Sequence, residues 1–366
     1  MRRIGLLGAT GAVGRSVLHH LRLAGAGPLR LGGRNAGGLQ TATLPGEEVV
    51  PVDITEPEGL RAFCTGCAVV VNAAGPTRLV MDCAVRAALD SGADYVDAAG
   101  DEPVHALLSA LPLPTGRRAV LSAGIMPGLT ALLPRHLATE LPDARVLTAH
   151  AGGLDRFTRT AAGDYVASLA NGHGEPMAAW RGGRARRALV ALHDVAIPFF
   201  PHPVSAFPYL SRENERVAGG LGLERADWYN VFAGRHLREA FGDVQHRLAA
   251  IGEEEAIDLL CRATALDLAG RTPYQIMVCR LENRARARVA VVRGTDGYAL
   301  SGAFAAFAAL AVRDGALPPG LHFAGEVMDT ASALAQLRTS PAVAALELLD
   351  IAPTAAAVPA FDDGVL

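Results

Sequence analysis

The sequence predicts an α/β protein: an N-terminal Rossmann domain built on a doubly wound parallel sheet, followed by a second α+β domain with a mixed sheet. An apolar strand, a glycine-rich turn and the start of a helix occupy residues 4–15. Strand and helix patterns then alternate up to residue 125, and beyond it strands joined by short turns replace that alternation. With 366 residues, half of them apolar, the chain is long enough for two cores.

Three glycines, Gly8, Gly11 and Gly14, follow the first strand with the spacing GxxGxxG. Gly8 permits a tight turn, Gly11 lets the backbone approach a pyrophosphate, and Gly14 lets the next helix, expected over residues 12–23, pack closely on the strand. The first N–H groups of that helix would face the phosphates. The motif predicts a dinucleotide site, with a purely structural turn as the alternative.

The residue after the second strand, expected over residues 29–33, indicates which dinucleotide binds. An NAD site places an Asp or Glu there against the ribose 2′-hydroxyl, whereas an NADP site places a cation there for the extra phosphate. This chain has Arg34, whose planar guanidinium suits a phosphate dianion. We therefore expect NADPH rather than NADH, and the alternative is a solvated surface arginine.

Two further strands end in residues that we expect at the cofactor, since ligands of doubly wound sheets lie at the carboxyl ends of the strands. The third, residues 49–53, ends in Asp53, which would accept a hydrogen bond from the adenine amino group. The fourth, residues 68–72, runs into a loop expected along the nicotinamide ribose: Asn72, Ala73, Ala74, Gly75 and Pro76. The alternatives are a helix N-cap for Asp53 and a plain turn for Gly75 and Pro76.

Composition limits the classes of partner. A net charge of −3 gives no basic field for nucleic acid, and the longest apolar stretch, residues 303–312, is too short to cross a bilayer. No charged-then-apolar leader precedes the first strand. We therefore expect a cytoplasmic protein that binds neither nucleic acid nor membrane.

Two residue types exclude further chemistries. All 34 cationic side chains are arginines, which excludes the Tyr–Lys pair of short-chain dehydrogenases, lysine-bound pyridoxal phosphate and a P-loop. The five cysteines include a CxxC at Cys64 and Cys67, but no second pair or histidine cluster completes a zinc site. We expect no metal.

Five segments together resemble the saccharopine dehydrogenase-like oxidoreductases: residues 8–14, 33–35, 71–76, 93–101 and 122–128. The resemblance implies an NADP-binding domain, a substrate domain with a mixed sheet, frequently a dimer, and hydride transfer to or from a C=N or occasionally a C=C bond. Carried onto this sequence, it implies nucleotide contacts at Gly8, Thr10, Gly11, Ala12, Val13, Arg34 and Asp53 and along residues 72–76.

The change of pattern and this resemblance together divide the chain. We expect an NADP-binding domain at residues 1–125, a substrate and dimerisation domain at 126–320, a helical segment returning to the first domain at 321–352, and a loose tail at 353–366. Within the second domain we expect strands at residues 146–153, 274–282 and 287–294, and an ordered loop over the cleft at residues 196–212.

Reduction of an imine needs one acid near the product nitrogen, and a carboxylate can stabilise the iminium cation. Asp97 and Asp101 follow the carboxyl end of a strand, or alternatively cap the next helix. In the second domain His150 ends an expected strand, while Tyr165 and His173 lie in polar, glycine-punctuated stretches. A packed or surface position is the alternative for each of these three. The candidate catalytic residues are Asp97, His150, Tyr165 and His173.

The leading hypothesis is an NADPH-dependent reductase of a C=N bond in an amino-acid-derived or specialised metabolite, a homodimer acting on a small-molecule or carrier-bound substrate. Two alternatives stay open. One is a trans-acting reductase of enoyl or thioester-linked groups on carrier-bound chains, and the other is a non-catalytic sensor that binds NADP.

Overall fold

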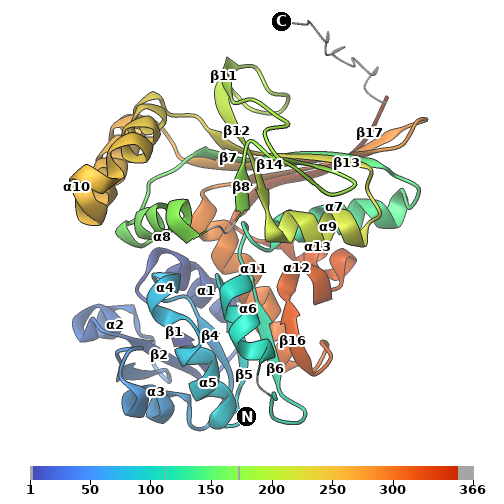
Figure 1. Cartoon of the computed structure of the whole chain (residues 1–366). Helices are drawn as coiled ribbons and strands as arrows, with labels where there is room; N and C mark the ends of the chain where they lie inside the picture. The colour runs from blue at the N-terminus through green and yellow to red at the C-terminus, as the bar shows by residue number, and fades with distance from the viewer. Residues whose placement is uncertain (1–2, 111, 172–173, 353–366) are drawn as a thin grey trace, which may run out of the picture.

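The computed structural model describes residues 3–110, 112–171 and 174–352. Two lobes lie one above the other, and each is built around one sheet (Figure 1). In the part of the chain described, no helix combines the length and the apolarity needed to span a membrane.

The sheet of the first lobe is parallel, with the strand order β16-β6-β5-β4-β1-β2-β3. The order reverses between β1 and β4, and a doubly wound sheet opens its ligand crevice at such a point. The strands are β1 (Arg3–Leu7), β2 (Leu29–Gly33), β3 (Glu48–Pro51), β4 (Cys67–Asn72), β5 (Asp94–Asp97), β6 (Arg118–Leu121) and β16 (Gly320–Phe323).

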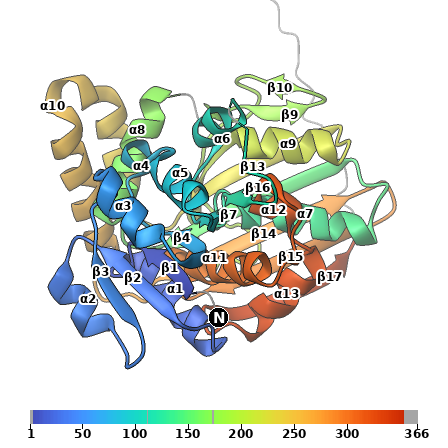
Figure 2. The same ribbon diagram turned by 90° about the horizontal axis from the view of Figure 1, so that it is seen from below.

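Helices cover both faces of this sheet (Figure 2). Buried residues of α1 (Ala12–Leu23), α2 (Ala36–Ala42) and α11 (Gly297–Arg313) pack on one face. Those of α3 (Pro57–Cys64), α5 (Cys83–Asp90) and α6 (Glu102–Ser109) pack on the other, and the short α4 (Thr77–Val80) follows β4. This arrangement confirms the predicted Rossmann architecture.

The sheet of the second lobe is mixed, as predicted, because β7 runs parallel to β13 and antiparallel to β14. Its main path is β10-β9-β13-β7-β14-β15-β17; β12 pairs with β13, and β8 and β11 pair with β12. The strands are β7 (Val146–Leu154), β8 (Gly174–Pro176), β9 (Ala179–Arg181), β10 (Arg184–Ala185), β11 (Leu192–Val195), β12 (Val204–Ser211), β13 (Arg225–Phe232), β14 (Tyr274–Glu282), β15 (Ala287–Gly294) and β17 (Val343–Ile351).

The helices of the second lobe form two groups (Figure 1). Between this sheet and the first lobe lie α7 (Leu129–Glu140), α9 (Arg212–Gly220), α12 (Ala324–Val327) and α13 (Thr330–Thr339). At one side, α8 (Arg159–Asn171) and α10 (Arg235–Leu268) pack together in an apolar cluster of their own. The helical path of α10 is interrupted at Gly252, whose φ is +78°.

The prediction of a loop over residues 196–212 is wrong in its second half, because residues 204–211 form β12. This strand pairs antiparallel with β13, and Pro208 lies inside it opposite Tyr229. A proline argues against a strand when only the sequence is read, since it lacks the N–H that a ladder needs. The pairing therefore forms where local sequence preference opposes it.

The chain also divides between the two sheets differently from the expected ranges. Helix α11, expected in the second domain, packs on α1 so closely that a Cβ on Gly302 would lie 2.4 Å from Ser16 Cβ. Strand β17, expected to return to the first domain, pairs with β15 in the second sheet instead. The reason for the first difference is that α11 is apolar on most of its surface and needs cover on all sides.

Candidate cofactor site and interdomain cavity

The turn between β1 and α1 is held by contacts that only glycine allows. Gly8 has a φ of +76°, and a Cβ there would lie 2.7 Å from the backbone of Ala73 in the loop after β4. A Cβ on Gly14 would lie 2.0 Å from the Gly8 carbonyl oxygen. These two glycines therefore bring β1, α1 and the loop after β4 into direct backbone contact.

Helix α1 begins at this turn with an open N-terminus. Gly11 is its N-cap residue and is exposed, no side chain caps the helix, and its first turn, with Ala12 and Val13, contains no acidic residue. Backbone N–H groups at a helix start, together with the helix dipole, attract an anion. The turn therefore fits the diphosphate of a dinucleotide, and Thr10 lies within it.

At the same edge of the sheet, Arg34 follows β2 and Asp53 follows β3. Arg34 is exposed. One carboxylate oxygen of Asp53 accepts hydrogen bonds from the Thr55 N–H at 2.9 Å and the Thr55 hydroxyl at 2.8 Å. These bonds, and then the charge of Arg34, lower the pKa of Asp53. The N-cap of α3 is Glu56, so Asp53 does not cap that helix.

The loop of residues 72–76 is shaped by the side chain of Asn72, which is only 2% exposed. Its Oδ1 accepts from the Ala74 N–H at 3.1 Å, and its Nδ2 donates to Asp97 Oδ2 at 3.1 Å. The Ala73 N–H donates to the Leu7 carbonyl at 3.0 Å. The loop is thus fixed to β1 on one side and to β5 on the other, beside the point where the strand order reverses.

Helix α8 of the second lobe reaches this loop. Asp164 Oδ1 accepts from the Thr77 N–H at 3.0 Å, and a Cβ on Gly75 would lie 2.6 Å from Thr160 Cγ2. Gly75 is therefore required by the approach of a second-domain helix as well as by the loop. Thr160 is not predicted from the sequence, and Gly75 is the signal that points to a close neighbour at this place.

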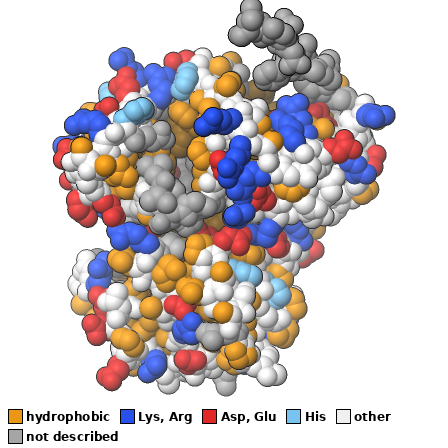
Figure 3. Space-filling view, viewed as in Figure 1, with side chains coloured by type: hydrophobic (Ala, Val, Ile, Leu, Met, Phe, Trp, Pro, Cys, Tyr) orange, Lys and Arg blue, Asp and Glu red, His pale blue; other side chains and the backbone are white. Residues whose placement is uncertain are grey.

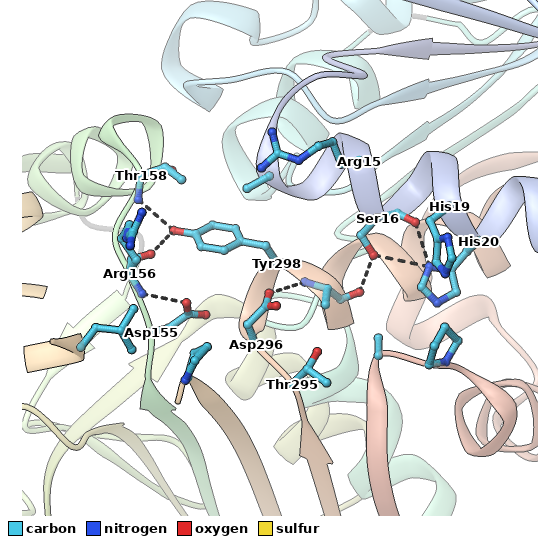
Figure 4. Close-up of a pocket in the computed structure, with 16 residues that line it drawn as sticks. Arg15, Ser16, His19, His20, Asp155, Arg156, Thr158, Thr295, Asp296 and Tyr298 are labelled. Atoms are coloured by element: carbon cyan, nitrogen blue, oxygen red, sulfur yellow. Dashed lines mark hydrogen bonds between the residues drawn. The ribbon is translucent and has the colours of Figure 1, made fainter. Parts of the chain in front are cut away.

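A cavity of about 650 Å³ opens beside α1, with a lining drawn from both lobes. It includes Ala12 at the start of α1, so it adjoins the glycine-rich turn. Figure 4 shows Arg15 on α1 and Arg156 after β7 at its borders, with Tyr298 at the start of α11 between the two lobes. The cavity gives a small molecule room next to a dinucleotide on α1.

The lining of this cavity is held by hydrogen bonds that join α11 to the segment after β7 (Figure 4). The Tyr298 hydroxyl donates to the Arg156 carbonyl at 2.7 Å and accepts from the Thr158 N–H at 3.0 Å. Asp155 accepts from the Gly297 N–H at 2.7 Å, and burial raises the pKa of Asp155. Tyr298 therefore positions the backbone of Arg156 and Thr158 against α11. Asp155 is a lining residue that is not predicted from the sequence.

Asp97, a candidate catalytic residue, is enclosed by protein groups. It is 3% exposed and accepts hydrogen bonds from the Tyr95 hydroxyl at 2.6 Å, the Ala99 N–H at 2.9 Å and Asn72. Burial raises the pKa of Asp97, against the effect of these bonds. Its carboxylate holds the loop of residues 72–76 in place and does not line the cavity.

The side chain of His150 lies on the face of the second sheet that is turned away from the first lobe, where it cannot donate a proton to a substrate between the lobes. Its neighbours in β7, Ala149 and Ala151, belong to the core shared with α7, so the His150 side chain is on the opposite face, away from the first lobe. Its ring stacks on Tyr229 with 4.9 Å between centroids. Burial lowers the pKa of His150 to about 4, so the imidazole is neutral at pH 7.

The two other candidates do not meet at one site either. The Tyr165 ring packs with its centroid 4.6 Å from that of Phe241, in the apolar cluster between α8 and α10. His173 lies outside the described residues. The structure therefore does not assemble Asp97, His150 and Tyr165 into a common centre.

The cysteines of the CxxC segment belong to the first core. Cys64 and Cys67 are buried, and burial raises the pKa of the Cys64 thiol to about 12. Among the residues described, no group of three or more His, Cys, Asp or Glu side chains is placed to hold a metal ion.

Comparison with known proteins agrees with this geometry. Residues 8–109 match the NAD(P)H-binding family model. A saccharopine dehydrogenase-like oxidoreductase of Arabidopsis thaliana is 33% identical over 112 residues, a match that covers 26% of this chain and only 25% of the length of that relative. The resemblance that the N-terminal segments predict is thereby confirmed for the first domain.

The fold of the whole chain also has a counterpart. The structure of saccharopine dehydrogenase (L-Glu forming) from Saccharomyces cerevisiae superposes with a TM-score of 0.70, covering 96% of this chain and all of that one at 14% identity. The N-terminal lobe is therefore an NAD(P)H-binding domain, and the complete chain has the two-domain fold of saccharopine dehydrogenase.

Proposed function

We propose that this protein is an NADPH-dependent reductase of a C=N bond. The observation that carries the proposal is the open N-terminus of α1 at the glycine-rich turn, with the Arg34 guanidinium on the same edge of the sheet. The first feature suits a diphosphate, and the second suits a 2′-phosphate. The names of the two relatives support oxidoreductase chemistry.

The chain offers a residue set for each part of the cofactor. The N–H groups of the first turn of α1, at Ala12 and Val13, would bind the diphosphate, and Arg34 would bind the 2′-phosphate. Asp53 would meet the adenine, and the loop of residues 72–76 would follow the nicotinamide ribose. NADPH, when bound, supplies a hydride to an electrophilic carbon.

The protein's part in such a reaction is to position the substrate and to exclude water. Helix α8 covers the loop of residues 72–76 through Thr160 and Asp164, so that edge is closed by the second lobe. The cavity beside α1 has walls from both lobes and adjoins the turn. A substrate held there would be fixed between the two domains.

Fluorescence titration of the full chain with NADPH and NADH tests the cofactor, and we expect the tighter binding with NADPH. Turnover is then measured as the loss of nicotinamide absorbance. Cyclic imines are one set of test substrates, and acyl-carrier or enoyl thioesters are the other. Folded protein that binds neither nucleotide rules out the proposal. Oxidation of NADPH by thioesters alone would favour the carrier-bound reductase instead.

A further inference from the structure

The guanidinium of Arg15 is held at the glycine-rich turn, although the residue itself belongs to α1. Its Nη1 donates to the Thr10 carbonyl at 2.8 Å, which turns the side chain back toward the start of the helix. Figure 4 shows it extending away from Ser16 and His19, which follow it along α1. Among the residues described, its Nε and Nη2 have no hydrogen-bond partner. Two of the three guanidinium nitrogens therefore remain available to a ligand.

The charge of Arg15 is not balanced by an acidic group. The residue is exposed, it forms no ion pair within the described part of the chain, and the first turn of α1 contains no Asp or Glu. The positive end of the helix dipole lies at the same place, so a cation there is unfavourable for the ligand-free helix. A local electrostatic rule is broken in this way where a ligand binds. The group that would balance both charges is an anion.

The anion that belongs at this turn is the diphosphate of the nicotinamide cofactor. The first lobe is an NAD(P)H-binding domain, and a diphosphate fits the open start of α1. The Arg15 N–H donates to the Gly11 carbonyl at 2.9 Å, and the Arg15 guanidinium donates to Thr10. Arg15 is therefore tied to the turn through its backbone and through its side chain, whereas Arg34 follows a different strand, β2.

The rest of the surface does not supply a positive field that could replace this charge. The chain has a net charge of −3, and Figure 3 shows acidic and basic side chains mixed over the visible face of both lobes. Electrostatic attraction of a diphosphate therefore depends on individual charges close to the turn.

We propose that Arg15 binds the diphosphate of the cofactor together with the backbone N–H groups at the start of α1; this rests on the proposed function. Its planar guanidinium would offer Nε and Nη2 to the phosphate oxygens while Nη1 keeps its bond to Thr10. The two arginines then have different tasks. Arg15 serves NADPH and NADH alike, because both contain the diphosphate, and Arg34 serves only the 2′-phosphate of NADPH.

The first test compares Arg15→Ala with Arg61→Ala. Arg61 is also an exposed arginine of a first-lobe helix, but it lies in the last turn of α3, on the opposite face of the sheet. In fluorescence titrations, Arg15→Ala should bind both NADPH and NADH about 10-fold more weakly than the wild type. Arg61→Ala should bind both as the wild type does. An equal loss in the two variants would mean that only the overall charge matters, and it overturns the proposal.

Fragments of the cofactor separate the tasks of the two arginines. ADP-ribose contains the diphosphate without the 2′-phosphate, and adenosine 2′-monophosphate contains the 2′-phosphate without the diphosphate. The affinity of each is measured by its displacement of NADPH. Arg15→Ala should weaken the binding of ADP-ribose and leave that of adenosine 2′-monophosphate unchanged, and Arg34→Ala should do the reverse. Loss of adenosine 2′-monophosphate binding alone in Arg15→Ala overturns the assignment to the diphosphate.

Two further measurements distinguish the charge of Arg15 from structural support of the turn. Arg15→Gln keeps a side-chain N–H that can donate to the Thr10 carbonyl but has no charge, so it should bind ADP-ribose as weakly as Arg15→Ala does. Raising the ionic strength from about 0.05 M to about 0.5 M should reduce the difference between wild type and Arg15→Ala, because salt screens exposed charges. Wild-type affinity in Arg15→Gln, or a difference that salt does not change, overturns the contact.

The wild type separates this proposal from the one on which it rests. If the wild type binds NADPH and NADH, and Arg15→Ala binds them equally well, the role of Arg15 is overturned and the proposed function stands. Folded wild type that binds neither dinucleotide overturns the proposed function, and the contact of Arg15 with the cofactor along with it.

Discussion

Asn72 and Asp97 share a buried hydrogen bond, with 3.1 Å between Asn72 Nδ2 and Asp97 Oδ2, at the carboxyl ends of two neighbouring strands. Asn72 also accepts from the Ala74 N–H, so this one amide connects the candidate nicotinamide loop to β5. The loop geometry therefore depends on a side chain that touches no ligand in our proposal.

Replacing Asn72 by alanine should weaken NADPH binding through the loop. The change removes both hydrogen bonds of the amide and leaves the buried Asp97 with one donor fewer, at a cost of about 1–3 kcal/mol in the free energy of unfolding. Asn283→Ala is the matched control, since Asn283 makes an exposed Asn–Asp bond to Asp143 at 2.9 Å. Calorimetric titration and chemical denaturation measure the two effects; equal NADPH affinities in the two variants contradict the loop assignment.

Replacing Arg34 by alanine should change the affinity for NADPH and leave the affinity for NADH as it is. Loss of the guanidinium removes a charge-assisted contact to a 2′-phosphate, so NADPH should bind about 10- to 100-fold more weakly while NADH is unaffected. Arg313→Ala, which removes an arginine paired with Asp314 at the end of α11, serves as the control. If NADPH and NADH lose affinity in parallel, Arg34 does not bind the phosphate.

Gly14→Ala should disrupt the turn itself. The new Cβ would lie 2.0 Å from the Gly8 carbonyl oxygen, a backbone atom that can move only if β1 and α1 separate. We expect a loss of stability of at least about 2 kcal/mol and loss of NADPH binding. Gly242→Ala in α10, where a Cβ meets no atom within 4 Å, should instead be neutral or stabilise by up to about 1 kcal/mol. Thermal and denaturant unfolding of both variants give the comparison, and similar stabilities would show that the turn tolerates a side chain.

Glu213 should make stability depend on pH. This buried carboxyl accepts hydrogen bonds from the Gly128 N–H at 2.7 Å and from the Thr130 hydroxyl, and burial raises its pKa from 4.5 to about 7. Because the folded state keeps the proton that the unfolded state has already lost, this contribution is full below pH 4.5 and is lost as the pH rises through 7.

The measurement is denaturant unfolding of wild type and Glu213→Gln across that interval. The difference between them should fall with pH by at most about 1.4 kcal/mol per unit. A difference that stays constant over the interval means that Glu213 does not change its proton affinity on folding.

The elements that the sequence predicts well are those with a strong local signal. Helix α1 begins and ends at the expected residues, because the three glycines fix its start and the apolar spacing from Val13 to Leu21 fixes its face. Strands β14 and β15 also have the expected bounds, since each is a run of apolar and β-branched residues ended by a short turn.

The parts that the sequence did not predict depend on which elements meet. His150 lies in the middle of β7, and only the place of its neighbours Ala149 and Ala151 in the shared core shows that its side chain points away from the first lobe. Thr160 is a second example, because only the packing of α8 on the loop after β4 brings it beside Gly75. Contacts between side chains of different domains produce no periodic pattern in the sequence.

The packing of α11 has a consequence for how the molecule can be taken apart. The polypeptide passes between the two sheets three times, after β6, after β15 and after β16. A chain shortened to its first third would lack α11, the longest helix on one face of the nucleotide-binding sheet. It would also leave β6 as an unpaired edge strand. The two interleaved domains therefore fold as one unit. A movement of one domain relative to the other has to bend all three connections.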